Sequence, residues 1–229
     1  MNLRPLLPVA LLLFSAGPAR AQFPEGDRWY QNPLGFKPLN LHTAQGFLVP
    51  ALAVGVSLLL TEKDRGLTHR LSVHNETGLS WGYKYPRTRL AQNDTGIGFR
   101  LRRFMSIGVE LGAYWPNDDF NRTTGFAVRP FARFYPINNE RWRLYFESGG
   151  GLIHLNHEFP NPTDRDPRRG TRWNGITKYG LGAEVDIGKS MAAAIGIKHT
   201  HVSNGNREGV ERNPSHDSNG FLLGFSRRF

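Results

Sequence analysis

Cysteine is absent from the 229 residues of this chain. Its absence excludes disulfide bonds, thiolate nucleophiles and cysteine-based metal sites. Long hydrophobic runs are also scarce: the single apolar stretch near the length of a spanning helix lies at the start, and the mean hydropathy is −0.45. The chain is therefore not a multi-helix membrane protein. An aromatic content of 12% and 26 glycines argue against a disordered chain.

The first residues have the features of an export signal. One charge, Arg4, precedes an apolar core at residues 6–17, and Ala19-Arg20-Ala21 supplies the small-x-small pattern that signal peptidase accepts. The core is shorter than the ~20 residues of a spanning helix, which disfavours a membrane anchor. We therefore expect residues 1–21 to be a signal peptide that is cleaved after Ala21. Losing Arg4 and Arg20 lowers the formal net charge of +10 by two, to +8.

The segment 22–66 gives a mixed signal. Residues 47–60 are apolar, but they include Pro50 and Gly55 and are too few for a spanning helix. The pattern is compatible with an amphipathic periplasmic segment and with an additional strand, and it does not decide between them.

From about residue 71 to residue 229, apolar residues recur with a period of two rather than 3.6. In the clearest segment Met105, Ile107 and Val109 lie on one face, and Ser106 and Gly108 lie on the other. Strands of roughly ten residues are long enough to cross a bilayer when tilted. Eight such strands are expected, at about 70–84, 94–102, 105–115, 126–135, 142–152, 173–187, 190–203 and 219–229.

The polar face of these segments is unusual for a soluble sandwich, which leaves its polar face in water. It combines glycines with charges of both signs, which suits the filled interior of a narrow closed barrel, where ions must pair. The apolar face would then meet lipid. The charged residues on the polar face are Arg100, Arg102, Glu110, Arg129, Arg133, Arg143, Glu147, Glu184, Lys198 and Arg228.

The connections between the segments alternate between long and short, and the chain ends in an aromatic residue, Phe229. Bacterial outer-membrane barrels have this asymmetry, with long external loops and short periplasmic turns. We therefore predict that residues 67–229 form an all-β domain, an eight-stranded antiparallel outer-membrane β-barrel in a Gram-negative bacterium. A soluble lipocalin-like barrel is the alternative.

A pair of potentially catalytic side chains lies near the end of the seventh segment. His201 and Ser203 are two residues apart, so they are neighbours on one face of a strand, and that face is the apolar one. An imidazole can activate a serine hydroxyl as a nucleophile, and an acidic group can fix the imidazole tautomer. If both termini are periplasmic, the pair lies level with the outer leaflet, where lipid A carries ester-linked acyl chains. The candidate acids that follow are Glu208, Glu211 and Asp217.

The sequence around this pair resembles the lipid A 3-O-deacylase family (PagL-like, acyloxyacyl hydrolases). The resemblance rests on His201-Val-Ser203-Asn204 and Asn213-Pro214-x-x-Asp217-Ser218, and upstream on residues 145–149, 170–171 and 180–182. It covers residues 94–229 and implies an eight-stranded outer-membrane barrel that removes an acyl chain from lipid A of lipopolysaccharide, at the 3-position.

The resemblance also implies roles for individual residues. Ser203 is implied as the nucleophile, His201 as the general base, and Asn213 as an oxyanion donor together with a backbone amide near Asn204. The acid matches Asp217, with Glu211 as the rival because the preceding loop is about two residues longer than is usual in the family. The resemblance implies no cofactor and no metal.

Other interpretations also fit the sequence. His199, His201 and His216 could form a metal site near Asp217, and the barrel could be non-catalytic, with a structural or adhesion role. The pattern also leaves homodimerisation open, and nucleic acid is an unsuitable partner for an exported barrel. Arginines of the long loops are candidate ligands for lipid A phosphates: Arg87, Arg89, Arg122, Arg165, Arg168, Arg169, Arg172, Arg207 and Arg212.

Overall fold

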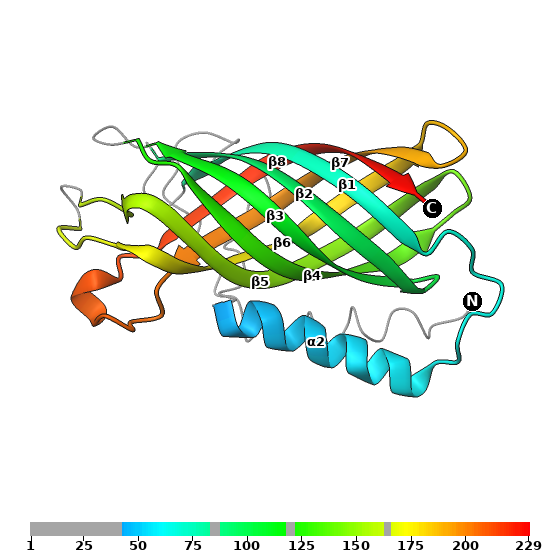
Figure 1. Cartoon of the computed structure of the whole chain (residues 1–229). Helices are drawn as coiled ribbons and strands as arrows, with labels where there is room; N and C mark the ends of the chain where they lie inside the picture. Colours follow the sequence, from blue (N-terminus) through cyan, green and yellow to red (C-terminus); the bar gives the residue numbers. More distant parts are fainter. Residues whose placement is uncertain (1–42, 83–87, 118–121, 163–165) are drawn as a thin grey trace.

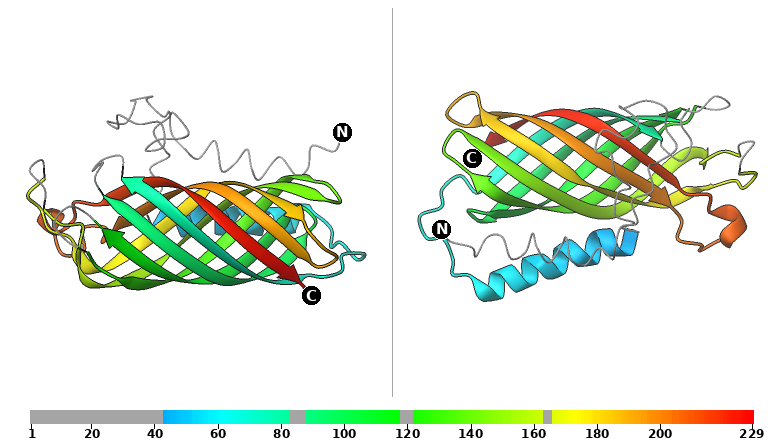
Figure 2. Two further views of the ribbon diagram at one scale, coloured as in Figure 1. Left: turned by 90° about the horizontal axis from the view of Figure 1, so that it is seen from above. Right: turned by 180° about the vertical axis from the view of Figure 1, so that it is seen from behind.

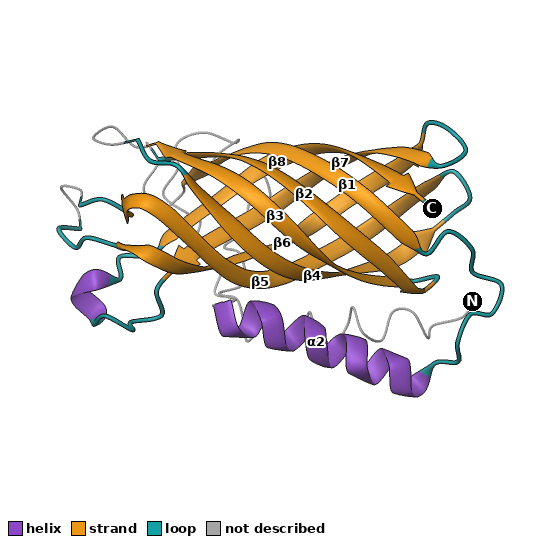
Figure 3. Cartoon of the chain, viewed as in Figure 1, coloured by secondary structure: helices purple, strands orange, loops and turns teal. Residues whose placement is uncertain are grey.

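The computed structural model describes residues 43–82, 88–117, 122–162 and 166–229. The expected signal peptide at residues 1–21 and the following residues up to 42 lie outside the described part. The described chain forms a closed barrel of eight strands with one long helix beside it (Figures 1 and 3). The elements are α2 (Thr43–Leu60), β1 (Leu71–Gly82), β2 (Arg89–Arg102), β3 (Met105–Asn117), β4 (Gly125–Asn138), β5 (Trp142–Phe159), β6 (Thr171–Asp186), β7 (Met191–Ser203), η3 (Val210–Arg212) and β8 (His216–Arg228).

Every strand pairs antiparallel with the next one along the chain, and β1 pairs with β8 to close the barrel. The closing register runs from Ser72 opposite Arg228 to Gly82 opposite Ser218. Closure leaves no unpaired sheet edge, which is what a barrel in lipid requires. The predicted fold class is thus confirmed.

Several strands extend further toward the long-loop end than the alternation of apolar residues predicts. β2 begins at Arg89 rather than near residue 94, and β5 continues to Phe159 rather than ending near residue 152. The added residues include the polar residues Gln92, Asn93 and Asn156, which belong to β2 and β5. They form backbone hydrogen bonds or register pairs with neighbouring segments although they are not apolar. Period-two hydropathy therefore marks only the part of each strand with an apolar outer face.

The asymmetry of the connections is confirmed. The connections at 103–104, 139–141 and 187–190 are short, whereas those at 83–88, 118–124, 160–170 and 204–215 are longer. The long connections lie at one end of the barrel and the short ones at the other. Figure 2 shows the loop with η3 at the opposite end from the C-terminus. We call these the long-loop end and the short-turn end.

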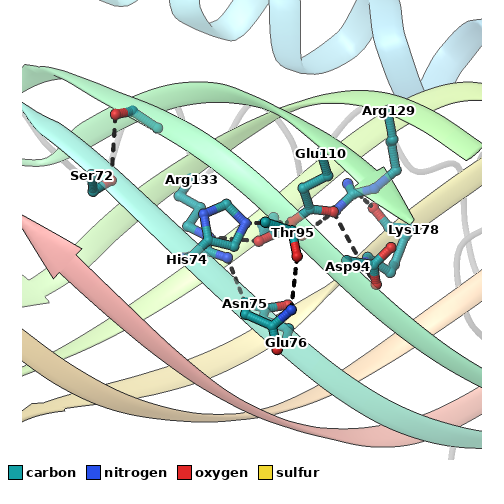
Figure 4. Close-up of polar contacts among 12 residues, drawn as sticks. Ser72, His74, Asn75, Glu76, Asp94, Thr95, Glu110, Arg129, Arg133 and Lys178 are labelled. Atoms are coloured by element: carbon teal, nitrogen blue, oxygen red, sulfur yellow. Dashed lines mark hydrogen bonds and ion pairs between the residues drawn. The ribbon is translucent and has the colours of Figure 1, made fainter. Parts of the chain in front are cut away.

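Ion pairs fill the middle of the barrel. The guanidinium of Arg133 bridges three carboxylates, Glu76 at 2.5 Å, Glu147 at 2.6 Å and Glu184 at 3.2 Å. The side chain of Arg133 is only 6% exposed. Lys198 lies 2.5 Å from Glu76 and 3.0 Å from Glu147. Arg129 and Lys178 neutralise Glu110 and Asp94 in the same way, and Figure 4 shows that part of the network. The expected pairing of charges inside a narrow barrel is present.

The interior glycines leave room for large side chains. A Cβ at Gly182 would overlap the ring of Tyr145, and a Cβ at Gly108 would overlap the ring of Phe131. Nearer the long-loop end the charged middle gives way to an apolar cluster, so side chains rather than an open lumen occupy the inside. The cluster contains Leu90, Tyr114, Ala127, Ile153, Leu155, Phe159, Ile176 and Val202.

Residues 43–60 form helix α2, not an additional strand. The helix lies along the outside of the barrel and contacts β4, β5, β6 and β7 (Figures 1 and 2). It contains Pro50, whose missing N–H leaves the carbonyl of Gly46 without its helical donor. No described helix combines the length and the apolarity that a membrane-spanning helix would need.

Candidate active site

The hairpin of β7 and β8 brings His201 and Asp217 together. The two residues are direct partners in the antiparallel register, although sixteen positions separate them in sequence. His201 Nδ1 lies 2.7 Å from Asp217 Oδ1, and His201 Nε2 lies 3.0 Å from Ser203 Oγ. With the proton on Nδ1, the imidazole donates to the carboxylate and accepts from the serine hydroxyl. The three side chains thus form a continuous hydrogen-bonded chain.

His201 and Ser203 lie on the outward face of β7. Lys198 and Thr200 have the opposite parity, and Lys198 reaches the ion pairs inside the barrel. The two side chains point outward, as expected for a lipid-facing pair. They are nevertheless nearly buried, because His201 is 7% and Ser203 5% exposed. A nucleophile and base that are nearly excluded from water interact more strongly than they would in solvent.

His199 lies next to these three residues, and the sequence suggested it only as a ligand of the alternative metal site. Its Nε2 lies 3.3 Å from Asp217 Oδ1, so one carboxylate oxygen is shared between two imidazoles. Its Nδ1 lies 3.0 Å from Asn219 Oδ1, and its ring packs on Tyr179 with 5.0 Å between centroids. The signal that could have identified it is its spacing, since His199 and His201 share a strand face.

Asn204 and Asn213, the expected oxyanion donors, lie together in the loop between β7 and β8. The backbone N–H of Asn204 donates to Asn213 Oδ1 at 3.2 Å, and Asn213 Nδ2 donates to Asn206 Oδ1 at 2.8 Å. The structure therefore brings the two residues together, but their donors and acceptors are engaged within the loop. To bind an oxyanion they would have to exchange these hydrogen bonds for contacts with the substrate.

Two residues at the end of the preceding long loop and the start of β6 support this arrangement. Thr171 Oγ1 accepts from Asn204 Nδ2 at 3.3 Å, which gives a structural place to a residue that carried the family resemblance. Arg168 donates to the carbonyl of Asn213 at 3.2 Å, and it also pairs with Asp166 at 2.7 Å. The loop after β7 is thus fixed by residues just before and at the start of β6.

Glu211, the rival acid, lies in η3 and is exposed. Asp217, not Glu211, is the acid within hydrogen-bonding distance of His201. Next to Glu211, Arg212 pairs with Glu158 at 2.6 Å, and Arg169 lies 3.7 Å from the same carboxylate. Some of the candidate phosphate ligands are therefore engaged in ion pairs between loops, and Arg87 and Arg165 lie outside the described residues.

The three histidines of the alternative metal site do not point to one place. His216 is the register partner of Val202, so it has the parity opposite to that of His201 and Asp217. It is fully buried and its ring packs on Phe159. Among the described residues, the group of side chains close enough to share a cation is Glu76, Glu110 and Glu147, which Arg129, Arg133, Lys178 and Lys198 already neutralise.

Solved structures with a similar fold are outer-membrane barrels. Neisserial surface protein A aligns with a TM-score of 0.50 and 8% identity, covering 69% of this chain and 96% of that one. The outer-membrane enzyme PagL aligns with a TM-score of 0.45 and 12% identity, covering 68% and 99%. The N-terminal barrel domain of Pseudomonas aeruginosa OprF aligns with a TM-score of 0.40 and 17% identity, covering 68% and 96%. At such low identities these likenesses concern the fold alone.

Sequence comparison is more specific. No curated protein matches the chain. The family model described as lipid A 3-O-deacylase (PagL) matches residues 99–226, which is more than half of the 229 residues. The match includes β7, the loop after it, and all of β8 except its last two residues. With its closed eight-stranded barrel, this chain therefore belongs to the lipid A 3-O-deacylase (PagL) family and resides in the outer membrane of a Gram-negative bacterium.

Proposed function

We propose that this protein is a serine esterase that removes the acyl chain ester-linked at the 3-position of lipid A. The observation that carries the proposal is the hydrogen-bonded chain from Asp217 through His201 to Ser203, with distances of 2.7 and 3.0 Å. Family membership supports the substrate. Three side chains in this order can supply a nucleophile, a base and an orienting acid.

In this mechanism Ser203 Oγ attacks the ester carbonyl, and His201 Nε2 takes the hydroxyl proton. The tetrahedral intermediate collapses, the bond to the sugar oxygen breaks, and His201 returns the proton to that oxygen. A water molecule, deprotonated by His201, then attacks the acyl-enzyme and releases the fatty acid. Throughout, Asp217 accepts the hydrogen bond of His201 Nδ1 and stabilises the imidazolium that forms.

The developing oxyanion needs donors. Asn213 Nδ2 and the backbone N–H of Asn204, the donors that the family resemblance implies, lie in the loop that follows Ser203. Both are engaged in hydrogen bonds within the loop, and catalytic hydrogen bonds in a free enzyme often tighten only when the substrate binds. Substrate binding would exchange these contacts for the oxyanion.

The position of the site on the barrel suits the substrate. Ser203 is the last residue of β7, at the long-loop end, which is the external end in outer-membrane barrels. A nucleophile there, on the outward face of a strand, lies near the level at which lipid A sugars meet their acyl chains. An ester in the outer leaflet would reach it without leaving the membrane.

Mass spectrometry of lipid A from cells with and without the protein tests this function. We expect loss of one acyl chain when the wild-type protein is present, with fragmentation assigning the loss to the 3-position. Ser203→Ala should restore the full pattern, and Ser190→Ala, in the short turn before β7, serves as the matched control. An unchanged pattern with wild-type protein that is shown to be folded would favour a non-catalytic barrel.

A further inference from the structure

The outer surface of helix α2 is apolar. Residues 43–60 include no charged side chain, so the helix has no face suited to water. The large side chains that point away from the barrel are well exposed: Phe47 at 48%, Leu48 at 55%, Leu52 at 68%, Leu59 at 87% and Leu60 at 60%. A helix that is apolar all round is expected in a protein core or in lipid.

The helix lies alongside the lipid-facing surface of the barrel. Near its start, Gly46 contacts Thr177 of β6. Its middle packs, through Ala53, on the outward side chains of Ala132 and Phe134. Just beyond its end, the Thr61 hydroxyl accepts from Arg102 at 3.1 Å, at the short turn between β2 and β3. The helix therefore extends from the level of Thr177 to the periplasmic end.

Small residues form the contact with the barrel. Gly46, Ala53 and Ser57 are buried there, and the Ser57 hydroxyl donates to the carbonyl of Ala53 at 2.6 Å. Small residues of this kind let helices pack closely in lipid. A Cβ at Gly46 would overlap Thr177, whereas a Cβ at Gly55 meets nothing within 4 Å. The two glycines of one helix thus differ sharply in what surrounds them.

The start of the helix also covers polar groups on the lipid side of the barrel. Thr177 and Ser148 are both fully buried, and within the described chain their hydroxyls have no hydrogen-bond partner. Thr177 lies against Gly46, whose carbonyl lacks a helical donor because Pro50 has no N–H. Covering these hydroxyls removes polar groups from a surface that otherwise faces hydrocarbon.

This contact lies beside the proposed active site. Thr177 is the register partner of His201, and Tyr179 is the partner of His199. Further along the two strands that carry the site, toward the short-turn end, Ile195 of β7 is 54% exposed and its register partner, Leu223 of β8, is 63% exposed. The helix therefore closes the β6 side of the surface at Thr177, beside His201. Further along, the β7–β8 surface remains an open apolar track, and β6 is also open from Leu181, which is 57% exposed.

We propose that α2 lies in the hydrocarbon of the outer membrane and forms a wall that directs the substrate's acyl chain onto the open track of β7 and β8. The first half of this proposal follows from the continuity of the apolar helix surface with the lipid-facing barrel. The second half rests on the proposed function, since it needs an acyl ester bound at Ser203.

Site-directed spin labels test the immersion of the helix without any reference to catalysis. The chain has no cysteine, so Leu52→Cys or Leu59→Cys introduces a single attachment site. In reconstituted protein we expect both labels to be accessible to oxygen and protected from a water-soluble nickel chelate. Val210→Cys, in η3 and 57% exposed, is the control that should show the reverse. Chelate access at 52 and 59 equal to that at 210 would overturn the placement in lipid.

A pair of glycine variants tests the wall. Gly46→Leu should push the start of the helix off Thr177, and Gly55→Leu adds the same side chain where there is space. The readout is the ratio of turnover for lipid A to turnover for p-nitrophenyl butyrate, whose short chain does not reach along the surface. We expect Gly46→Leu to lower this ratio roughly tenfold, the scale of lost apolar contacts in a binding site. Gly55→Leu should leave the ratio unchanged.

The outcomes separate the two proposals. An unchanged ratio in Gly46→Leu, or an equal drop in both variants, overturns the wall. If Gly46→Leu does not give the heat-dependent gel shift of a folded barrel, Gly46→Ala makes the same comparison with a smaller side chain. If wild-type protein hydrolyses neither ester, the proposed function and the wall fail together, and the spin labels still decide whether α2 lies in lipid.

Discussion

Asp217 lies directly across the β7–β8 hairpin from His201, and its Oδ1 is 2.7 Å from His201 Nδ1. The same oxygen lies 3.3 Å from His199 Nε2. The carboxylate is held by backbone pairing on a regular strand rather than by a loop. This geometry leads to specific expectations for each of the surrounding residues.

Exchange of the acid should distinguish Asp217 from Glu211. Asp217→Asn keeps the shape but removes the charge that fixes the tautomer of His201, so we expect turnover to fall roughly 10⁴-fold. Glu211→Gln, on the exposed η3, should change turnover little. The lipid A deacylation assay measures both, and a damaging Glu211→Gln with a tolerated Asp217→Asn would move the acid to Glu211.

Activation of Ser203 should make it reactive toward a fluorophosphonate probe. The hydroxyl donates to His201 Nε2 at 3.0 Å, so wild-type protein should form a covalent adduct that a peptide map assigns to Ser203. Ser203→Ala and His201→Ala should abolish both labelling and turnover. Ser190→Ala should be labelled as wild type is, and full activity of Ser203→Ala in a folded barrel would disprove the serine mechanism.

The oxyanion role of Asn213 predicts a partial loss. Asn213→Ala removes one side-chain donor while leaving the chain from Asp217 to Ser203 intact, so we expect kcat to fall about 10²–10³-fold. The fall should appear mainly in kcat rather than in KM, because the contact forms in the transition state. Asn206→Gly removes the partner of Asn213 Nδ2 and suits the positive φ of 62° at that position, so it is the control and should cost less. Equal losses in the two variants would indicate a role in loop structure alone.

His199 is expected to act as a positioning residue through Asp217. His199→Ala removes a group 3.3 Å from the carboxylate, and we expect a loss of roughly tenfold, much smaller than that of His201→Ala. His199→Gln keeps a donor at a similar reach and should restore part of the activity. If Gln and Ala variants are equally impaired, the hydrogen bond to Asp217 is not the reason for the loss.

The interior ion pairs predict a stability effect that is separate from catalysis. Glu147 is fully buried and contacts Arg129, Arg133 and Lys198. Glu147→Gln leaves these cations undercompensated, so we expect the free energy of unfolding to fall by about 3–5 kcal/mol. Urea unfolding in detergent micelles measures the change. The double variant Glu147→Gln with Lys198→Met should recover part of it, and a simple sum of the two single effects would contradict direct coupling.

The sequence by itself determined the barrel and the reactive pair. Strand number and the difference between the barrel ends follow from local signals, since side chains alternate along any strand and connection lengths are read directly. His201 and Ser203 are likewise two residues apart on one strand, so their proximity needs no knowledge of the rest of the chain.

Tertiary structure decided what depends on register and packing. Which acid lies against His201 is fixed by the pairing of β7 with β8, and both Asp217 and Glu211 fit the sequence. The parity of His216, which turns it away from the site, also follows from that register. The bridge from Arg133 to Glu76, Glu147 and Glu184 joins four different strands. Helix α2 depends most on the tertiary structure. Its residues are apolar on every side, so the sequence has no periodic pattern that shows which face packs on the barrel, and only the structure shows it.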